Sequence, residues 1–258
     1  MKIHWLEQTE ADVPQDLAWL GATELEQLST MRFAKRRGDW QLGRWTAKHA
    51  VAACLHLPAD FPSLAKIEVR QAASGAPEVF VASKPAPVTI SVSHSAGIGA
   101  CAVALSYGAL GCDVEMIEPR SDAFADDYFT TEEQQLVAQA TEDDRPLVLT
   151  LLWSAKESAL KALRAGLRLD TRCVIVTPEG LLRDQKEDVR VNVRDERANL
   201  PDFPARQANA ANGWRPLRVR HTEGTTFHGW WQHTPNLVRT LVAAPLPAPP
   251  VLLNIPPK

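Results

Sequence analysis

The sequence predicts an α+β protein made of two similar halves, with a site in the cleft between them. Two long helical patterns support this, at about residues 33–55 and 146–163, where apolar residues recur at spacings of three and four. Each long helix is followed by short β-branched runs that are typical of strands. The same order of elements therefore occurs twice, which indicates a duplicated architecture.

Turn and composition signals divide the chain into three parts. Gly108 marks a turn between two strand patterns, so we place the boundary between the halves near residues 107–111. We expect an N-terminal half at residues 1–108 and a C-terminal half at residues 109–244. Residues 245–258 are rich in proline and predict an extended or disordered tail.

Composition narrows the class of protein. The chain has 258 residues, 45% hydrophobic and 23% charged, which is typical of a globular protein. A formal net charge of -3 gives no overall basic field, so we expect neither nucleic acid nor membrane as a partner. No signal-peptide pattern occurs, and the four cysteines lack metal-ligand or disulfide spacing. We therefore expect a soluble, cytoplasmic protein with free thiols.

Periodicity places the elements of the N-terminal half. We expect strands at residues 2–6, 67–70, 79–81, 88–95 and 100–105, and helices at residues 23–28 and 33–55. Pro58 and Pro62 follow the second helix and end it, because proline cannot continue the helical hydrogen bonds. A turn at residues 73–77 joins the second and third strands.

The C-terminal half follows in the same way. We expect strands at residues 110–115, 172–177, 189–193, 217–221, 227–232 and 237–243, with a loop at residues 195–213. Thr130 and Glu133 form a capping-box pattern that opens one helix. Pro146 suits the first turn of the next helix, and Gly166 suits the residue just beyond its end.

One side of the helix at residues 146–163 carries functional side chains. At about 100° per residue, Trp153, Glu157 and Lys161 fall along one side. A surface ion pair between Glu157 and Lys161 also explains this pattern, and such pairs contribute only about 0.2–0.5 kcal/mol.

Two carboxylates share one side of the strand at residues 110–115. Side chains alternate along a strand, so Asp113 and Glu115 point the same way and repel each other. Either they face open water or a cation lies between them. All-oxygen ligands suit Mg²⁺ or Mn²⁺ rather than zinc.

Cations also gather on one face of the helix at residues 33–55. Arg37, Arg44 and Lys48 line up there, and their mutual repulsion costs stability unless they bind an anion such as a phosphate. The alternative is that this face of the helix is simply exposed to solvent. His94 lies in the Ser93-His94-Ser95 turn after a strand, where it either completes a local turn or approaches a phosphate.

These signals become more specific when they are combined. Glu157 can supply a third oxygen ligand beside Asp113 and Glu115, with Lys156 and Lys161 close to the metal. A divalent metal surrounded by several cations is the arrangement that a pyrophosphate or polyphosphorylated ligand requires.

At this point the chain resembles the 4′-phosphopantetheinyl transferases, of the large type that activates peptide-synthetase, polyketide-synthase and fatty-acid carrier proteins. Residues 111–115, Gly-Cys-Asp-Val-Glu, and residues 153–161, Trp-Ser-Ala-Lys-Glu-Ser-Ala-Leu-Lys, match the two signature motifs of the family in order and separation. Residues 91–95, Ser-Val-Ser-His-Ser, match a third motif, and the arginines at residues 36, 37 and 44 resemble its N-terminal basic motif. The likeness spans roughly residues 32–169.

The resemblance implies a reaction and a set of roles. Coenzyme A would bind with its pyrophosphate on Mg²⁺, held by Asp113, Glu115 and Glu157, and a serine of an apo acyl or peptidyl carrier protein would attack the β-phosphate. Glu157 would act as the base and Lys161 would neutralise the departing phosphate, giving 3′,5′-ADP. The implied coenzyme A-binding residues are Arg37, Arg44, Lys48, Ser93, His94, Asp113, Lys156 and Lys161.

The resemblance also implies a monomeric pseudodimer, in which two similar α/β subdomains enclose the active site. One departure concerns the Gly-x-Pro turn of the family, which commonly holds a basic residue where this chain has Ala76; Lys84 is a candidate substitute.

Two other functions use the same residues. A metal-dependent hydrolase of nucleotide pyrophosphates would put water in place of the serine, and a silent module would bind coenzyme A without modifying a carrier.

Overall fold

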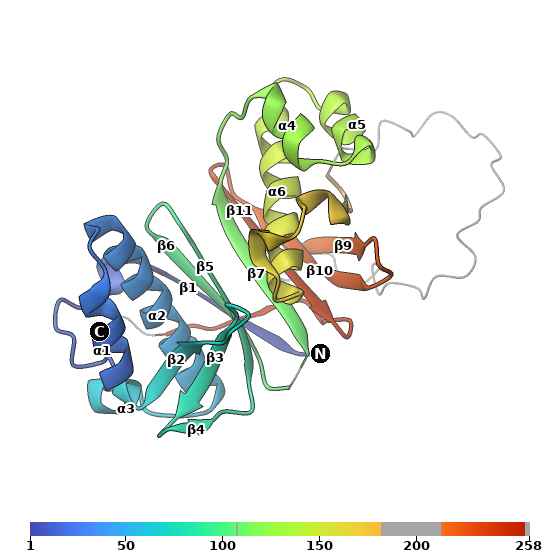
Figure 1. Cartoon of the computed structure of the whole chain (residues 1–258). Coiled ribbons are helices and arrows are strands. Elements are labelled where there is room, and N and C mark those ends of the chain that lie inside the picture. Colours follow the sequence, from blue (N-terminus) through green and yellow to red (C-terminus); the bar gives the residue numbers. More distant parts are fainter. Residues whose placement is uncertain (107, 182–212, 256–258) are drawn as a thin grey trace.

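The structure is a computed structural model that describes residues 1–106, 108–181 and 213–255, and it has mixed α+β architecture (Figure 1). The helices are α1 Ala22–Thr30, α2 Ala34–Cys54, α3 Phe61–Ala65, α4 Asp122–Tyr128, α5 Thr131–Gln139 and α6 Arg145–Ala162. The strands are β1 Ile3–Thr9, β2 Ile67–Gln71, β3 Pro77–Val81, β4 Lys84–Pro85, β5 Thr89–Ser95, β6 Ile98–Ala104, β7 Ala109–Met116, β8 Val174–Pro178, β9 Arg215–His221, β10 Thr226–His233, β11 Leu237–Ala244 and β12 Val251–Leu252.

The strands of the two halves lie in a corresponding spatial order. In the C-terminal half one sheet runs β7-β11-β10-β9-β8. In the N-terminal half the order β1-β6-β5 corresponds to β7-β11-β10, and the separate group β2-β3-β4 contains the counterparts of β8 and β9. The N-terminal sheet is thus interrupted between β5 and β3, whereas the C-terminal sheet is continuous.

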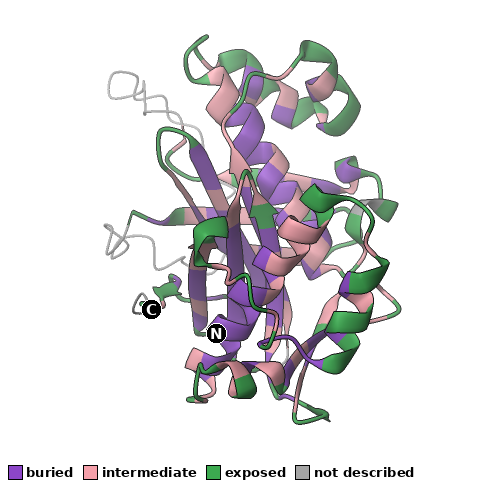
Figure 2. Ribbon diagram, turned by 90° about the vertical axis from the view of Figure 1, so that its left-hand side faces the viewer, coloured by how far each residue is buried: buried purple, intermediate pink, exposed green. Residues whose placement is uncertain are grey.

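Three hydrophobic clusters hold the layers together. The first packs α2 on the N-terminal strands and the second packs α6 on the C-terminal sheet. A third cluster lies between the two sheets and contains Trp5 from β1, Leu110 from β7 and Trp230 from β10. Figure 2 shows buried residues concentrated in the central strands and on the inner faces of the long helices. Burial of these aromatic and aliphatic side chains, at about 25 cal/mol per Å² of apolar area, is the main force that joins the halves.

The seam between the halves brings β5 beside β7. The backbone N–H of Cys112 donates to the Ser91 hydroxyl at 2.9 Å, which joins these two strands through a side chain. On the other face of β7, Gly111 allows α6 to approach closely, because a Cβ built there would lie 1.8 Å from the Ser158 carbonyl oxygen. The strand that carries Asp113 is therefore clamped between β5 and α6.

The proline-rich segment after β11 crosses from the C-terminal half to the N-terminal half. Its strand β12 pairs in parallel with β1, and the Leu253 N–H donates to the Trp5 carbonyl at 2.8 Å. Leu253 and Ile255 pack against the N-terminal core. Of the two states expected for residues 245–258, the extended one is found as far as residue 255.

Most expected elements are present at the expected places, including the capping box at Thr130 and Glu133 and the proline in the first turn of α6. Among the described α-helices and strands, four were not expected: the helices α3 and α4 and the strands β4 and β12. The strand expected at residues 189–193 and all but the last residue of the loop expected at residues 195–213 lie outside the described residues. Within the described part of the chain, no helix combines the length and apolar character needed to cross a bilayer.

Candidate active site

Asp113 on β7 is the centre of a group of polar side chains from both halves. It is 3% exposed, and its Oδ1 accepts two hydrogen bonds. One comes from the Ser93 hydroxyl on β5 at 2.7 Å and the other from the Lys161 ammonium on α6 at 2.8 Å. Oδ2 of Asp113 is buried and has no hydrogen-bond partner within the described structure. A buried carboxylate oxygen without a partner is costly in an empty protein, so this atom is suited to a ligand.

Glu115 lies two residues further along β7, on the same side as Asp113. Its Oε1 accepts the indole N–H of Trp153 at 3.2 Å, and its Oε2 lies 3.5 Å from the Ser95 hydroxyl and 3.9 Å from Arg120 Nη2. Burial, and then the charge of Asp113, raise the pKa of Glu115. Trp153 fixes the orientation of this carboxylate, which explains why an aromatic residue with an N–H donor stands at this position of the helix motif.

Glu157 and Lys161 lie one turn apart on α6, on the side that faces β7. The pKa of Glu157 is raised mainly by burial, and the charges of Asp113 and Glu115 raise it further while Lys161 opposes them. For Lys161, burial is the largest single influence and works against the charged form, but Asp113, Cys112 and Glu157 together outweigh it and raise the pKa of the ammonium. Lys161 also donates to the Cys112 carbonyl at 3.0 Å. The four ionisable groups therefore act on one another electrostatically.

The donor set suits a hard divalent cation, although the side chains are not assembled around one. Asp113 offers its unpartnered Oδ2, and all three expected ligands are carboxylates, the oxygen donors that Mg²⁺ prefers. Across the described residues, however, no group of three or more His, Cys, Asp or Glu side chains is placed to hold a metal ion. The three-carboxylate site therefore stays a prediction, with Asp113 and Glu115 adjacent and Glu157 as the group that has to join them.

A basic pocket of about 290 Å³ lies beside this group, on the N-terminal half. Arg44 lines it, with its guanidinium carbon 4.9 Å from the centre of the Trp40 ring. The buried Nε of Arg44 has no hydrogen-bond partner in the described structure and lies 3.9 Å from Glu24 Oε1, at the outer limit of an ion pair. The exposed His94 lines the pocket too, together with Arg36 and Arg70. Stacking on Trp40 keeps the Arg44 guanidinium available for an anion. Arg36 belongs to the basic motif named in the resemblance but was not assigned to coenzyme A, and Arg70 was missed because it lies on the strand β2 and outside every motif.

Two of the predicted coenzyme A-binding cations in the N-terminal half have other roles. Arg37 donates to the carbonyls of Leu28 at 3.1 Å and Met31 at 3.4 Å, and it does not line the basic pocket. Lys48 is fully buried and its ammonium contacts the Trp19 and Leu64 carbonyls and Glu24, so it cannot reach a ligand. The prediction that Arg37, Arg44 and Lys48 form one binding row is wrong for Lys48, because this part of the helix face packs inside the protein.

Lys156 is likewise wrong as a pyrophosphate-binding residue. Its side chain is fully buried, and its ammonium donates to the carbonyls of Thr171 at 2.9 Å and Val174 at 2.6 Å. The third contact is an ion pair of 2.8 Å with the equally buried Glu133. Lysine has three donors, and all three are used inside the protein.

Lys48 and Lys156 occupy matching positions in a repeated motif that our sequence analysis missed. Residues 45–49 read Trp-Thr-Ala-Lys-His and residues 153–157 read Trp-Ser-Ala-Lys-Glu. The two segments lie in α2 and α6, the long helices of the two halves. Comparison of the two helical segments with each other would have shown this repeat from sequence alone.

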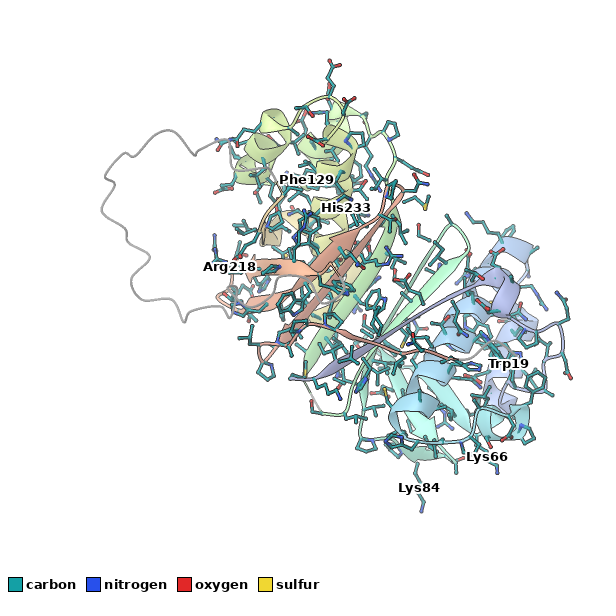
Figure 3. The ribbon with its side chains drawn as sticks, turned by 180° about the vertical axis from the view of Figure 1, so that it is seen from behind. Trp19, Lys66, Lys84, Phe129, Arg218 and His233 are labelled. Atoms are coloured by element: carbon teal, nitrogen blue, oxygen red, sulfur yellow. The ribbon has the colours of Figure 1, made fainter. Side chains whose placement is uncertain are left out.

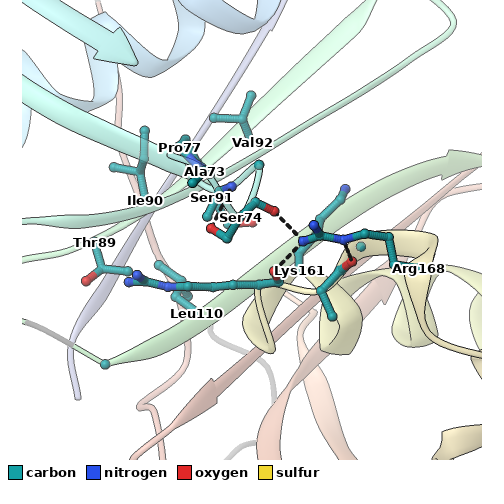
Figure 4. A pocket seen from close by; sticks show the side chains of 16 residues that line it. Ala73, Ser74, Pro77, Thr89, Ile90, Ser91, Val92, Leu110, Lys161 and Arg168 are labelled. Atoms are coloured by element: carbon teal, nitrogen blue, oxygen red, sulfur yellow. Dashed lines mark hydrogen bonds between the residues drawn. The ribbon is translucent and has the colours of Figure 1, made fainter. Parts of the chain in front are cut away.

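A larger pocket of about 660 Å³ lies between the halves, next to Lys161. Its N-terminal wall is the turn at residues 73–77 and the start of β5. Its C-terminal wall includes Leu110, Lys161, Arg164 and Arg168 (Figure 4). The sequence analysis singled out neither arginine, because they follow the helix in a segment without periodicity.

The comparison with known families agrees with this geometry. Residues 109–200 match the family model of the 4′-phosphopantetheinyl transferase superfamily. The match begins at β7 and ends within the C-terminal half. The matched region contains Asp113, Glu115, Glu157 and Lys161, whereas Ser93 and the basic pocket lie outside it. No curated protein sequence matches the chain at a significant level.

Proposed function

We propose that the protein transfers the 4′-phosphopantetheine group from coenzyme A to a serine of an apo acyl or peptidyl carrier protein. The observation that carries the proposal is the meeting of three elements at Asp113 on β7: its Oδ1 accepts a hydroxyl from β5 and an ammonium from α6, and its Oδ2 is left without a partner in the described structure. This group lies at the seam of the two halves, and its acidic strand lies within the region that matches the transferase family model.

The protein's own residues fit the steps of this reaction. Glu157 takes the proton of the carrier serine, and its raised pKa makes it a stronger base than an ordinary carboxylate. The serine oxygen then forms a bond to the β-phosphorus as the bond to the α-phosphate oxygen breaks, which releases 3′,5′-ADP. Lys161, kept protonated by Asp113, neutralises the charge that develops on the departing phosphate.

Asp113, Glu115 and Glu157 would hold Mg²⁺, or Mn²⁺, which when bound neutralises pyrophosphate oxygens. Ser93 and Trp153 hold the first two carboxylates in place from neighbouring elements. Such outer partners restrict the orientation of metal ligands. In the basic pocket, Arg44 and His94 would bind the nucleotide end of coenzyme A.

We further propose that the halves are related by a pseudo-twofold axis and that the protein is a monomer. The repeated Trp-x-Ala-Lys motif and the matching strand orders support the first point. The hydrophobic cluster between the two sheets supports the second, because one half already gives the other the partner that a dimer would supply. All four cysteines are free thiols and three are buried, which supports a reducing, cytoplasmic setting.

One mass measurement tests the transfer. The protein is incubated with coenzyme A, Mg²⁺ and an apo carrier domain, and the intact mass of the carrier is measured. Transfer adds the mass of one phosphopantetheine group, and omission of Mg²⁺ or addition of a chelator abolishes the gain. Free phosphopantetheine with an unchanged carrier would indicate a pyrophosphate hydrolase. Coenzyme A binding without any product, across a panel of carrier domains, would indicate a silent binding module.

A further inference from the structure

The pocket between the halves has an uneven distribution of charge. Its C-terminal wall carries three cationic side chains, Lys161, Arg164 and Arg168, and no Asp or Glu belongs to its lining. Its N-terminal wall is largely uncharged and includes the apolar side chains of Ile90 and Val92. Three cations without an acidic partner in the lining favour an anionic ligand. Lys161 is already paired with Asp113, so the arginines are the cations whose partners have to be found.

Arg168 spans the pocket from one half to the other. Its Nη2 donates to the Ser74 carbonyl at 2.6 Å, in the turn between β2 and β3 of the N-terminal half. Its Nε donates to the Ala165 carbonyl at 3.0 Å and its Nη2 to the Arg164 carbonyl at 3.3 Å, both within the C-terminal half. Figure 4 shows the guanidinium between the two walls.

These bonds leave one side of the guanidinium available. All three use Nε and Nη2, and no acceptor for Nη1 is found within the described structure. The three acceptors are backbone carbonyl oxygens, which carry no formal charge. Among the described residues, the positive charge of Arg168 therefore has no carboxylate partner. The planar, fixed guanidinium can thus hold the turn with one edge and a phosphate oxygen with another.

The turn that Arg168 contacts carries no cation itself. Residues 73–77 read Ala-Ser-Gly-Ala-Pro, and the candidate substitute Lys84 lies on β4 and projects away from the body of the protein (Figure 3). Lys84 lines neither the basic pocket nor the pocket between the halves. The positive charge at this turn therefore comes from the opposite half of the molecule, through Arg168.

We propose that Arg168 binds a phosphate group of coenzyme A while it holds the turn at residues 73–77 against the C-terminal half. The proposal deepens the proposed function, because it adds a binding residue for the same substrate. It assigns to residue 168 the shared chemistry of phosphate recognition, whether the phosphate belongs to the pyrophosphate or to the 3′-position. A bound phosphate would bridge the two halves through this one side chain.

The test measures coenzyme A binding directly, by calorimetry without a carrier protein, and transfer kinetics separately. For Arg168→Ala we expect the Kd for coenzyme A and its KM to rise about tenfold, as for loss of a charge-assisted hydrogen bond, with kcat unchanged. Arg168→Lys keeps the charge but not the forked geometry, so its Kd and KM should lie between those of the parent and those of Arg168→Ala. Arg172→Ala is the matched control, because Arg172 is an exposed arginine nearby that pairs with Asp170 and lines neither pocket.

A second ligand identifies the phosphate. If the Arg168→Ala defect disappears with 3′-dephospho-coenzyme A, Arg168 binds the 3′-phosphate; if it persists, Arg168 binds the pyrophosphate. Equal affinity of Arg168→Ala and the parent protein for coenzyme A overturns the proposal. A fall in kcat and in melting temperature at unchanged Kd also overturns it and leaves Arg168 as a brace. If the parent binds coenzyme A but transfers nothing, the proposed function fails while the binding comparison still decides the role of Arg168.

Discussion

The long helices α2 and α6 place a lysine in the same surroundings, one in each half of the molecule. Lys48 contacts two backbone carbonyls and Glu24, and Lys156 contacts two backbone carbonyls and Glu133. Each glutamate also caps the start of a shorter helix, where it accepts the N–H of Gly21 or of Thr130. Each accepts one more N–H from a strand, β2 in the first half and β8 in the second. The same buried circuit thus joins a short helix, a strand and the long helix twice.

The halves differ at the next residue and on the facing strand. His49 in α2 stands where α6 has Glu157. On β1, Glu7 forms a double ion pair with Arg239, whereas Glu115 on β7 lies beside Asp113, which raises its pKa. The comparison teaches that the lysines belong to the scaffold, which both halves retain, while the carboxylates whose pKa is raised by burial and by neighbouring carboxylates, Glu115 and Glu157, lie in the C-terminal half. We therefore expect the residues that carry out the reaction to lie in the C-terminal half.

The largest expected effect comes from the residue that distinguishes the two motifs. Glu157→Gln, a nearly isosteric change, should lower transfer by at least about 100-fold, because it removes the base and a metal ligand together. His49→Gln, the matching change in α2, should leave transfer per folded protein unchanged. Both are measured by the carrier mass assay, after circular dichroism has shown that each variant is folded. Full activity of Glu157→Gln would remove this residue from the mechanism.

The second expected effect concerns the two buried lysines and should be the same in both halves. Lys48→Met and Lys156→Met each remove from a buried glutamate the cation in direct contact with it, which costs about 3–5 kcal/mol of unfolding free energy. Urea unfolding measures this loss, and kcat per folded protein should stay near that of the parent. Adding Glu133→Gln to Lys156→Met should recover part of the loss, since the unpaired charge is gone. If Lys156→Met instead keeps its stability and loses coenzyme A binding, Lys156 is a ligand residue after all.

A third comparison uses two arginines of the same helix. Arg44→Ala should raise the KM for coenzyme A by about tenfold, because its guanidinium faces the basic pocket without a full partner. Arg37→Ala removes only hydrogen bonds to the end of α1 and should leave this KM close to that of the parent. Steady-state kinetics at saturating carrier protein measures both. Equal KM values for the two variants would mean that the pocket beside Trp40 does not bind coenzyme A.

The smallest expected effect is on the melting temperature. Removal of the charge of Glu115 should raise it, whereas the matching change on β1 should lower it. Burial and Asp113 raise the pKa of Glu115, so its folded carboxyl group holds a proton more tightly than the unfolded one. Its contribution to stability is then largest in acid and falls as pH rises through the unfolded pKa towards the folded one. Glu115→Gln should therefore raise the melting temperature of metal-free protein by a few degrees at neutral pH and have little effect in acid.

Glu7→Gln is the matched change on β1, and it should lower the melting temperature because it weakens the ion pair with Arg239. Differential scanning calorimetry in a chelating buffer measures both variants across the pH range. A lower melting temperature for Glu115→Gln at neutral pH would show that the acidic strand is not under electrostatic strain.

Local pattern was sufficient for most of the described helices and strands, and it also placed some residues that meet in space. Spacing put Asp113 and Glu115 on one side of β7, and Lys161, which was expected close to these carboxylates, does contact Asp113. The contact of Ser93 with Asp113 was not predicted, because Ser93 was assigned to coenzyme A instead. The roles of Lys48 and Lys156 did not follow, because each is decided by a glutamate and carbonyls distant in sequence. A helical wheel gives the direction of a side chain and not what lies there, so both lysines were assigned to the ligand when they belong to the core.

Other features depend on long-range contacts in the same way. Whether residues 245–255 dock depends on the free edge of β1, which no property of the tail itself reveals. Arg168 is similar, because its partner Ser74 lies in the other half of the chain. Sequence reasoning was accurate where neighbours along the chain determine the structure, and it failed where the deciding atom comes from elsewhere.

The pairing of β12 with β1 means that the N-terminal half in space is not a continuous stretch of sequence. A fragment ending at residue 108 would lack the outermost strand of its sheet, and the freed rim of β1 would offer unpaired N–H and C=O groups to other copies. Such a fragment is expected to self-associate. A synthetic peptide of residues 245–255, supplied in trans, has the contacts needed to complete it, which makes this seam a natural place to divide the protein for fragment complementation.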